Sequence, residues 1–144
     1  MTCCQHKSRF IIEGGNFEGA GKASIEIKKM LKGLDVNGEV LRRTAIAVYE
    51  AELNIISYAK RGNIDLCITA DDIHINVQDE GPGIEDIELA MQEGYSTATD
   101  RIREMGFGAG MGLHNIQNCS DELEISSELD KGTHLKITIN RKDE

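Results

Sequence analysis

The sequence predicts an α+β fold, a two-layer α/β sandwich in which helices cover one face of a mixed, mostly antiparallel β-sheet. Two segments place apolar residues three and four positions apart, as amphipathic helices do, and two pairs of segments alternate apolar and polar residues, as half-covered strands do. A chain of 144 residues is long enough for one domain with its own core. We expect that domain to span residues 8–140, behind a flexible tail at residues 1–7.

A strand and two helices are predicted in the first part of the chain. The strand covers residues 8–13 and ends at a pair of glycines, and the first helix covers residues 20–34. The second helix runs over residues 38–60, with Asn37 as its cap. Because this helix is apolar on several sides, we expect the sheet to cover one side and other elements the rest, with the remaining gap open to a ligand.

A β-hairpin follows the second helix. Apolar and polar residues alternate over residues 64–69 and 73–78, on either side of an acidic turn. Asp79 lies on the same side of the second strand as its apolar residues, so its carboxylate should point into the covered layer. A carboxylate in that position needs a partner.

The rest of the sequence predicts a lid, a helix and another hairpin. Residues 84–105 lack steady periodicity beyond a short turn or two, and we expect them to form a mobile lid. A helix should begin in the glycine-rich run that follows, where unpaired backbone amides favour an anion. Strands at residues 122–128 and 133–140 form the hairpin. The apolar residues expected on the helix are Met111, Leu113, Ile116 and Cys119.

Charge and hydropathy argue against two kinds of partner. The net charge of −9 disfavours nucleic acid, because phosphate contacts need a surface rich in lysine and arginine. No apolar run is long enough to span a bilayer, and the first ten residues lack the apolar stretch of a secretory signal. We therefore expect a cytoplasmic protein that contacts neither a membrane nor nucleic acid directly.

The four cysteines do not suggest a metal site, because no CxxC pair occurs among them. Cys67 falls in a strand pattern and is expected to be a small core residue. Cys3 and Cys4 fall in the predicted tail, which should leave them loose. Their reactivity is expected to be incidental.

Glu50 and Asn54 form the first candidate site. They are four residues apart on the second predicted helix and therefore face the same way. A carboxylate can take a proton from water or a hydroxyl group, and an amide oxygen can ligate Mg²⁺, which prefers oxygen ligands and keeps several waters. The alternative is an ordinary polar stripe on an exposed helix face.

Two stretches that contain glycine form the other candidate sites. In residues 79–83 the carboxylate of Asp79 precedes a tight turn at Gly81, Pro82 and Gly83, so an adenine amino group could donate to it; an ordinary turn is the alternative. Glycines at alternate positions in residues 106–113 are costly in backbone entropy and usually serve a ligand or a close approach. The run is not a Walker motif, because no GKS or GKT follows it; a flexible turn or helix packing is the alternative. The candidate binding residues of this run are Gly106, Gly108, Gly110, Met111, Gly112 and Leu113.

Single residues elsewhere could complete such a site. Thr133 lies on the same side of its strand as the apolar residues, so its hydroxyl should face the covered layer near Asp79; a threonine that merely favours a strand is the alternative. Arg101 and Arg103 could reach a terminal phosphate, but we favour the interpretation that they are a solvated surface pair. We interpret His114 as a helix residue rather than a phosphate contact.

Four motifs, taken together, resemble those of a known family. In order and spacing, Glu50-x-x-x-Asn54, Asp79-x-Gly81-x-Gly83, the glycine run and the closing Lys131-Gly132-Thr133 resemble the ATP-binding motifs of the gyrase, Hsp90, histidine kinase and MutL superfamily. The resemblance covers residues 8–140 and implies the histidine-kinase-like ATPase fold. It implies that Glu50 is the general base, that Asn54 ligates Mg²⁺ and that Asp79 binds the adenine amino group. The glycines of the run would hold the phosphates, and Thr133 would support the base pocket.

As a small single-domain form, the chain most resembles bacterial anti-sigma-factor and switch-type serine kinases, which phosphorylate a serine on STAS-domain antagonist proteins. This resemblance implies an ATP- and Mg²⁺-dependent protein serine/threonine kinase, with a STAS-domain antagonist and a sigma factor or other switch protein as partners, and it allows a homodimer. His114 departs from the pattern, at a position where proline is expected. Two other functions stay open: an ATP- or ADP-responsive binding module without phosphotransfer, and a detached catalytic domain that phosphorylates a histidine on another protein.

Overall fold

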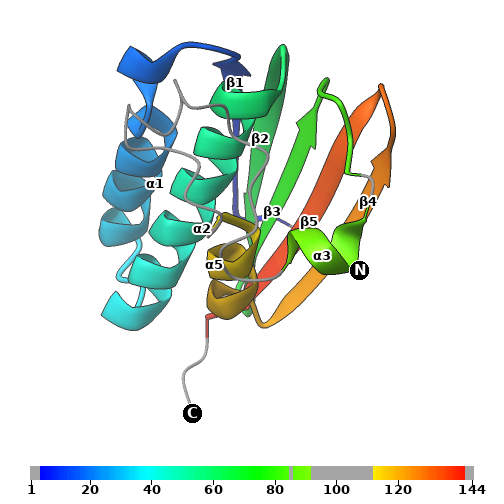
Figure 1. Ribbon diagram of the computed structural model, residues 1–144. Coiled ribbons are helices and arrows are strands. Elements are labelled where there is room, and N and C mark those ends of the chain that lie inside the picture. Colours follow the sequence, from blue (N-terminus) through cyan, green and yellow to red (C-terminus); the bar gives the residue numbers. More distant parts are fainter. Residues whose placement is uncertain (1–3, 85, 92–111, 142–144) are drawn as a thin grey trace.

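Five antiparallel strands form the sheet on which the molecule is built (Figure 1). The structure is a computed structural model and describes residues 4–84, 86–91 and 112–141. The strand order across the sheet is β1-β2-β3-β5-β4, and each pair of neighbours is antiparallel, so the sheet is more regular than the mixed arrangement predicted. The strands are β1 (His6–Glu13), β2 (Arg61–Ile68), β3 (Asp72–Asp79), β4 (Glu122–Glu128) and β5 (Gly132–Asn140).

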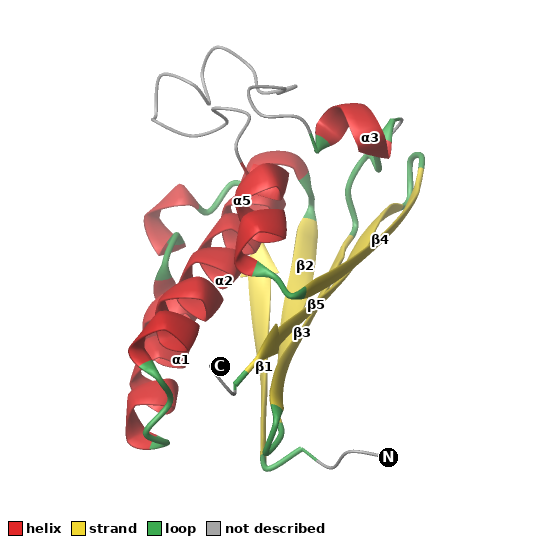
Figure 2. Cartoon of the chain, turned by 90° about the horizontal axis from the view of Figure 1, so that it is seen from below, coloured by secondary structure: helices red, strands yellow, loops and turns green. Residues whose placement is uncertain are grey.

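The helices lie on one face of this sheet, as Figure 2 shows. In the part of the chain that the structure describes, no helix is both long enough and apolar enough to cross a bilayer. The helical elements are η1 (Phe17–Gly19), α1 (Lys22–Gly33), α2 (Gly38–Tyr58), α3 (Ile87–Ala90) and α5 (Gly112–Cys119). The predicted two-layer α+β sandwich, covered on one face, is therefore confirmed.

The core lies between the two layers and is made largely of aliphatic side chains. Burial alternates along β2 and β3, so every second residue packs beneath the helices while its neighbours face water. Burying one such isoleucine contributes roughly 1.5–3 kcal/mol, which explains why the alternation fixes the face of each strand. The fully buried isoleucines are Ile27, Ile55, Ile64, Ile68, Ile73, Ile75, Ile116, Ile137 and Ile139.

The two long helices begin in different ways. Asn37 caps α2 as predicted, because its side-chain oxygen accepts a hydrogen bond of 2.7 Å from the backbone amide of Glu39. The cap position of α1 is Gly21, which has no side chain to offer. The first turn of α1 instead lies over Glu52, a carboxylate of α2 that is 1% exposed.

The first strand and the cysteines depart from the prediction. β1 begins at His6, two residues earlier than expected, and His6 pairs with Ile68 of β2. Just before it, Cys4 forms a disulfide with Cys67, with the two Cα atoms 5.3 Å apart. Cys67 is therefore not a small core residue: it is half-buried on the uncovered face of β2, and Cys4 is tied down rather than loose.

Candidate functional site

The candidate residues gather where α2 and β3 both end. The backbone amide of Lys60, just after α2, donates a 3.0 Å hydrogen bond to the carbonyl oxygen of Glu80, just after β3. The N-terminal end of α5 and the β4–β5 hairpin lie at the same end of the molecule (Figure 2). The fold thus brings together segments from the middle and the end of the chain.

Glu50 and Asn54 lie on the face of α2 that α5 covers. The side-chain amide of Asn115 on α5 donates a hydrogen bond of 2.9 Å to Oε2 of Glu50. Asn54 meets the first residue of α5, since a Cβ added to Gly112 would lie 2.8 Å from its Oδ1 atom. Both residues of the predicted pair are half-buried and both contact the same short helix.

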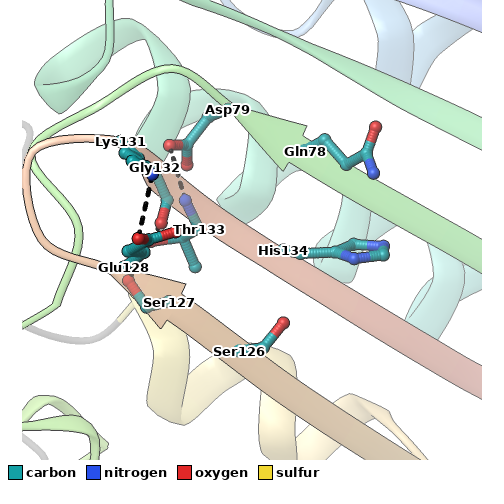
Figure 3. Close-up of a pocket in the computed structure, with 9 residues that line it drawn as sticks. All are labelled: Gln78, Asp79, Ser126, Ser127, Glu128, Lys131, Gly132, Thr133 and His134. Atoms are coloured by element: carbon teal, nitrogen blue, oxygen red, sulfur yellow. Dashed lines mark hydrogen bonds and ion pairs between the residues drawn. The ribbon is translucent and has the colours of Figure 1, made fainter.

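Asp79 ends β3 and points into the covered layer, where it has a partner. Its Oδ1 atom accepts a hydrogen bond of 3.1 Å from the backbone amide of Thr133 on β5 (Figure 3). Burial raises the pKa of Asp79, and the backbone amides of Thr133 and Gly81 act in the opposite direction by favouring the charged form. The carboxylate that needed a partner therefore finds it across the sheet.

The hydroxyl of Thr133 belongs to a small hydrogen-bond network. It lies 3.0 Å from the hydroxyl of Ser127, its register partner on β4. Ser127 donates its proton to the carbonyl oxygen of Gly132, so Thr133 is the donor between the two hydroxyls. Ser127 also accepts a 2.7 Å bond from the backbone amide of Ile84, which ties the loop after β3 to the hairpin.

Two glycines beside Asp79 are required by the backbone. Gly83 has φ of 79° and Gly132 has φ of 150°, which L side chains rarely adopt. A Cβ on Gly83 would collide with the carbonyl oxygen of Glu128, and one on Gly132 with that of Asp79. The predicted turn is therefore built by close backbone approach, whichever ligand it serves.

A shallow hollow of about 490 Å³ wraps around this end of the sheet (Figure 3). Among the residues that the structure describes, its walls come from β3, β4, β5 and the turn between the last two, and α2 does not contribute. His134, in its wall, has a ring Nε2 atom that is enclosed without a hydrogen-bond partner among those residues. The lining residues are Gln78, Asp79, Ser126, Ser127, Glu128, Lys131, Gly132, Thr133 and His134.

Part of the predicted site lies outside the described residues. Gly106, Gly108, Gly110 and Met111 fall there, as do Arg101, Arg103 and most of the expected lid. Of the same run, Gly112 begins α5 and Leu113 packs against the core. His114 lies one turn from Asn118, and its Nε2 atom is 3.2 Å from the side-chain nitrogen of that residue.

Two residues that contact the predicted site residues, Ser127 and Asn115, were missed from the sequence. Ser127 could have been found, because it lies on the same side of β4 as Leu123 and Ile125 and so faces the covered layer. Asn115 carried no such signal, since its partner Glu50 is 65 residues away. Contacts between distant helices are decided by packing rather than by local spacing.

The donor atoms suit a magnesium ion that is held together with a ligand. Glu50 and Asn54 offer oxygen atoms, which Mg²⁺ prefers, and Mg²⁺ usually completes its shell with waters and phosphate oxygens. Among the described residues, no group of three or more acidic, histidine or cysteine side chains could hold a metal ion alone. Because Gly112 has no side chain, its backbone can approach Oδ1 of Asn54 closely; an added Cβ would lie 2.8 Å from that atom.

Comparison with protein families decides the relationship. Residues 39–143 match the model of the family described as histidine kinase-, DNA gyrase B-, and HSP90-like ATPase. The chain belongs to this ATPase family. The matched range includes all four motifs that suggested the family, and the expected resemblance is thereby confirmed.

Curated relatives are similar over most of the chain. An anti-sigma F factor of Thermoanaerobacter sp. (strain X514) is 38% identical over 110 residues, which cover 73% of each chain. An anti-sigma F factor of Clostridium perfringens (strain 13 / Type A) is 34% identical over 131 residues, covering 87% of this chain and 89% of the other. Among solved structures, the Acinetobacter baumannii histidine kinase AdeS matches with a TM-score of 0.51 at 16% identity, over 94% of this chain and 68% of that one. This last likeness shows the fold.

Proposed function

We propose that this member of the ATPase family is an ATP- and Mg²⁺-dependent protein serine/threonine kinase that acts as a partner switch in the cytoplasm. Its substrate would be a serine on a STAS-domain antagonist, with a sigma factor as a second partner. The observation that carries the proposal is the meeting of Glu50 and Asn54 with the first turn of α5, at the end of the fold where Asp79 lies. The relatives named anti-sigma F factor support the choice of partner.

Asp79 would recognise the base of the nucleotide. An adenine amino group is a hydrogen-bond donor and the half-buried carboxylate of Asp79 is an acceptor, so the two complement each other. The backbone amide of Thr133 already orients this carboxylate. The glycine turn beside it leaves no side chain between the carboxylate and a flat ring.

Glu50 would act as the general base and Asn54 would help to hold Mg²⁺. In the transfer, the substrate serine oxygen forms a bond to the γ-phosphorus, the bond from that phosphorus to the β–γ bridging oxygen breaks with its electron pair leaving on ADP, and the serine proton passes to Glu50. Bound Mg²⁺ supplies positive charge that offsets the charge of the phosphates. The task of the protein is therefore mainly to position groups and to compensate charge.

The first test is titration calorimetry with ATP and ADP, each with and without Mg²⁺, followed by transfer from labelled ATP to purified STAS-domain proteins. We expect binding that strengthens with Mg²⁺ and an acid-stable phosphate on the acceptor. Glu50→Gln should bind nucleotide but lose transfer. Glu26→Gln changes an exposed glutamate of α1 that pairs with Lys29, and serves as the matched control. A Glu50→Gln variant that keeps its transfer rate overturns the assignment of the base.

A nucleotide-responsive binding module is the second candidate. The name anti-sigma F factor describes a protein directed against a sigma factor, and such an action needs binding rather than phosphotransfer. Under this alternative, nucleotide binding would change the affinity for a protein partner, and no labelled phosphate would reach any acceptor. The calorimetric and transfer experiments together separate the two candidates.

A further inference from the structure

The contact between Asn115 and Glu50 joins the short helix α5 to the proposed base. The amide nitrogen of Asn115 lies 2.9 Å from Oε2 of Glu50, and both side chains are half-buried. Oε2 of the carboxylate is thus held by a side chain of α5.

Three contacts show how α5 is aligned with α2. Gly112 meets Asn54, Asn115 meets Glu50, and just after α5 the carboxylate of Asp121 lies 3.3 Å from the guanidinium of Arg43. Residue numbers rise on one helix as they fall on the other, so the two segments are antiparallel. Two of the three contacts involve the two residues of the proposed catalytic and metal-binding pair. α5 therefore lies directly along the functional face of α2.

We propose that Asn115 is a positioning residue that holds the carboxylate of Glu50 and thereby sets the rate of phosphoryl transfer; this inference rests on the function proposed above. A glutamate side chain has several rotatable bonds, and one hydrogen bond to a residue on a packed helix removes much of that freedom. An asparagine amide is neutral, so it orients the carboxylate without cancelling its charge. Its nitrogen cannot take up the substrate proton, and Asn115 therefore does not compete with Glu50 as the base.

Asparagine and aspartate have nearly the same shape, which makes their exchange a sharp test. Asn115→Ala removes the donor, whereas Asn115→Asp keeps the volume but places a second carboxylate against Glu50. The matched control is Asn118→Ala, which removes the same amide from an exposed position of the same helix, where it contacts His114. For each full-length variant, kcat and KM for ATP are measured with a STAS-domain acceptor, alongside ADP affinity by calorimetry.

We expect kcat of Asn115→Ala to fall about ten- to a hundredfold, the size of one hydrogen bond to a charged group, with KM and ADP affinity within about twofold of native. The kcat of Asn115→Asp should fall further than that of Asn115→Ala, because the new carboxylate repels that of Glu50. Asn118→Ala should keep the native kcat. Asn115→Ala removes the donor without adding a charge, and a native kcat for this variant overturns the proposal.

Exchanging the two groups tests the contact without relying on activity. In the double variant Glu50→Gln/Asn115→Asp, the amide and the carboxylate trade places and can form the hydrogen bond again. We expect its melting temperature to recover from that of Asn115→Asp, while transfer stays absent because the base is gone. A double variant that melts no higher than Asn115→Asp overturns the contact. If the native chain transfers no phosphate but the melting temperature of the double variant recovers, the proposed function is wrong and the contact between Asn115 and Glu50 is still supported.

Discussion

Oε2 of Glu52 accepts a hydrogen bond of 3.4 Å from the backbone amide of Ala23, so a side chain of α2 caps the first turn of α1. The carboxylate is 1% exposed, and its Oε1 atom is enclosed without a hydrogen-bond partner among the described residues. Glu52 lies two residues from both Glu50 and Asn54, and two residues correspond to a rotation of about 200° around an α-helix. Glu52 therefore points away from the side of α2 that carries Glu50 and Asn54. One helix thereby serves the site on one side and anchors α1 on the other.

Glu52→Gln should change how stability depends on pH. Burial raises the pKa of Glu52, while nearby amides of α1, Ala23 first, act against it. A carboxyl whose pKa is raised on folding binds more protons in the folded chain than in the unfolded chain, so its contribution to stability falls as pH rises from about 4. We expect urea unfolding to show the native chain losing stability relative to Glu52→Gln between about pH 4 and pH 7. A difference that stays constant over this range would contradict the assignment.

Asp79→Asn should weaken adenine nucleotide binding without weakening the fold. The amide removes the charged acceptor, and we expect Kd for ADP to rise about ten- to a hundredfold. Burial raises the pKa of Asp79, so the free energy of unfolding of the native chain falls as pH rises and this carboxyl ionises. The neutral amide of Asp79→Asn does not ionise and avoids this loss of stability near pH 7. The control is Asp72→Asn, at the opposite end of the same strand. Unchanged ADP affinity by calorimetry would remove Asp79 from the pocket.

Breaking the disulfide should cost stability. Cys4 and Cys67 are 63 residues apart in the chain, and the chain-entropy estimate for closing such a loop is about 4 kcal/mol. We expect Cys4→Ser to unfold at lower urea than the native chain, and dithiothreitol to lower the native midpoint to that of the variant. Dithiothreitol should leave Cys4→Ser itself unchanged. If alkylation of the unreduced protein labels both Cys4 and Cys67 as free thiols, the disulfide does not form.

Gly132→Ala should damage both the hairpin and the site. A Cβ on residue 132 would collide with the carbonyl oxygen of Asp79, and the backbone there has φ of 150°. We therefore expect the free energy of unfolding to fall by about 1–3 kcal/mol and ADP binding to weaken. The matched control is Gly33→Ala, at the end of α1, where an added Cβ meets nothing within 4 Å. The free energy of unfolding of Gly33→Ala should rise by up to about 1 kcal/mol, because alanine favours a helix more than glycine does. Equal urea midpoints for the two variants would contradict this account of the turn.

Most of the fold could be predicted because its signals are local. The alternation in β2 and β3 is a burial pattern, and the cap at Asn37 depends on a residue two positions away. The inward direction of Asp79 followed from the same alternation, although its partner did not. Such features need no knowledge of which segments meet.

The features that could not be predicted depend on long-range packing. Cys4 reaches Cys67 because β1 pairs with β2, with His6 opposite Ile68, and once that register is set the two Cα atoms lie 5.3 Å apart. Asn115 reaches Glu50 because α5 packs antiparallel to α2. Periodicity finds the buried face of each element, and it does not identify the element that covers that face.

The place of β5 in the sheet has a consequence for the growing chain on the ribosome. This strand follows the other four strands of the sheet in the chain, yet it lies inside the sheet, between β3 and β4. Until residues 132–140 have emerged, the edge of β3 has no neighbour on that side, and Asp79 lacks the amide of Thr133. An unpaired edge of this kind favours aggregation during synthesis. A prematurely terminated product would therefore be a client for chaperones or proteases rather than a partly active protein.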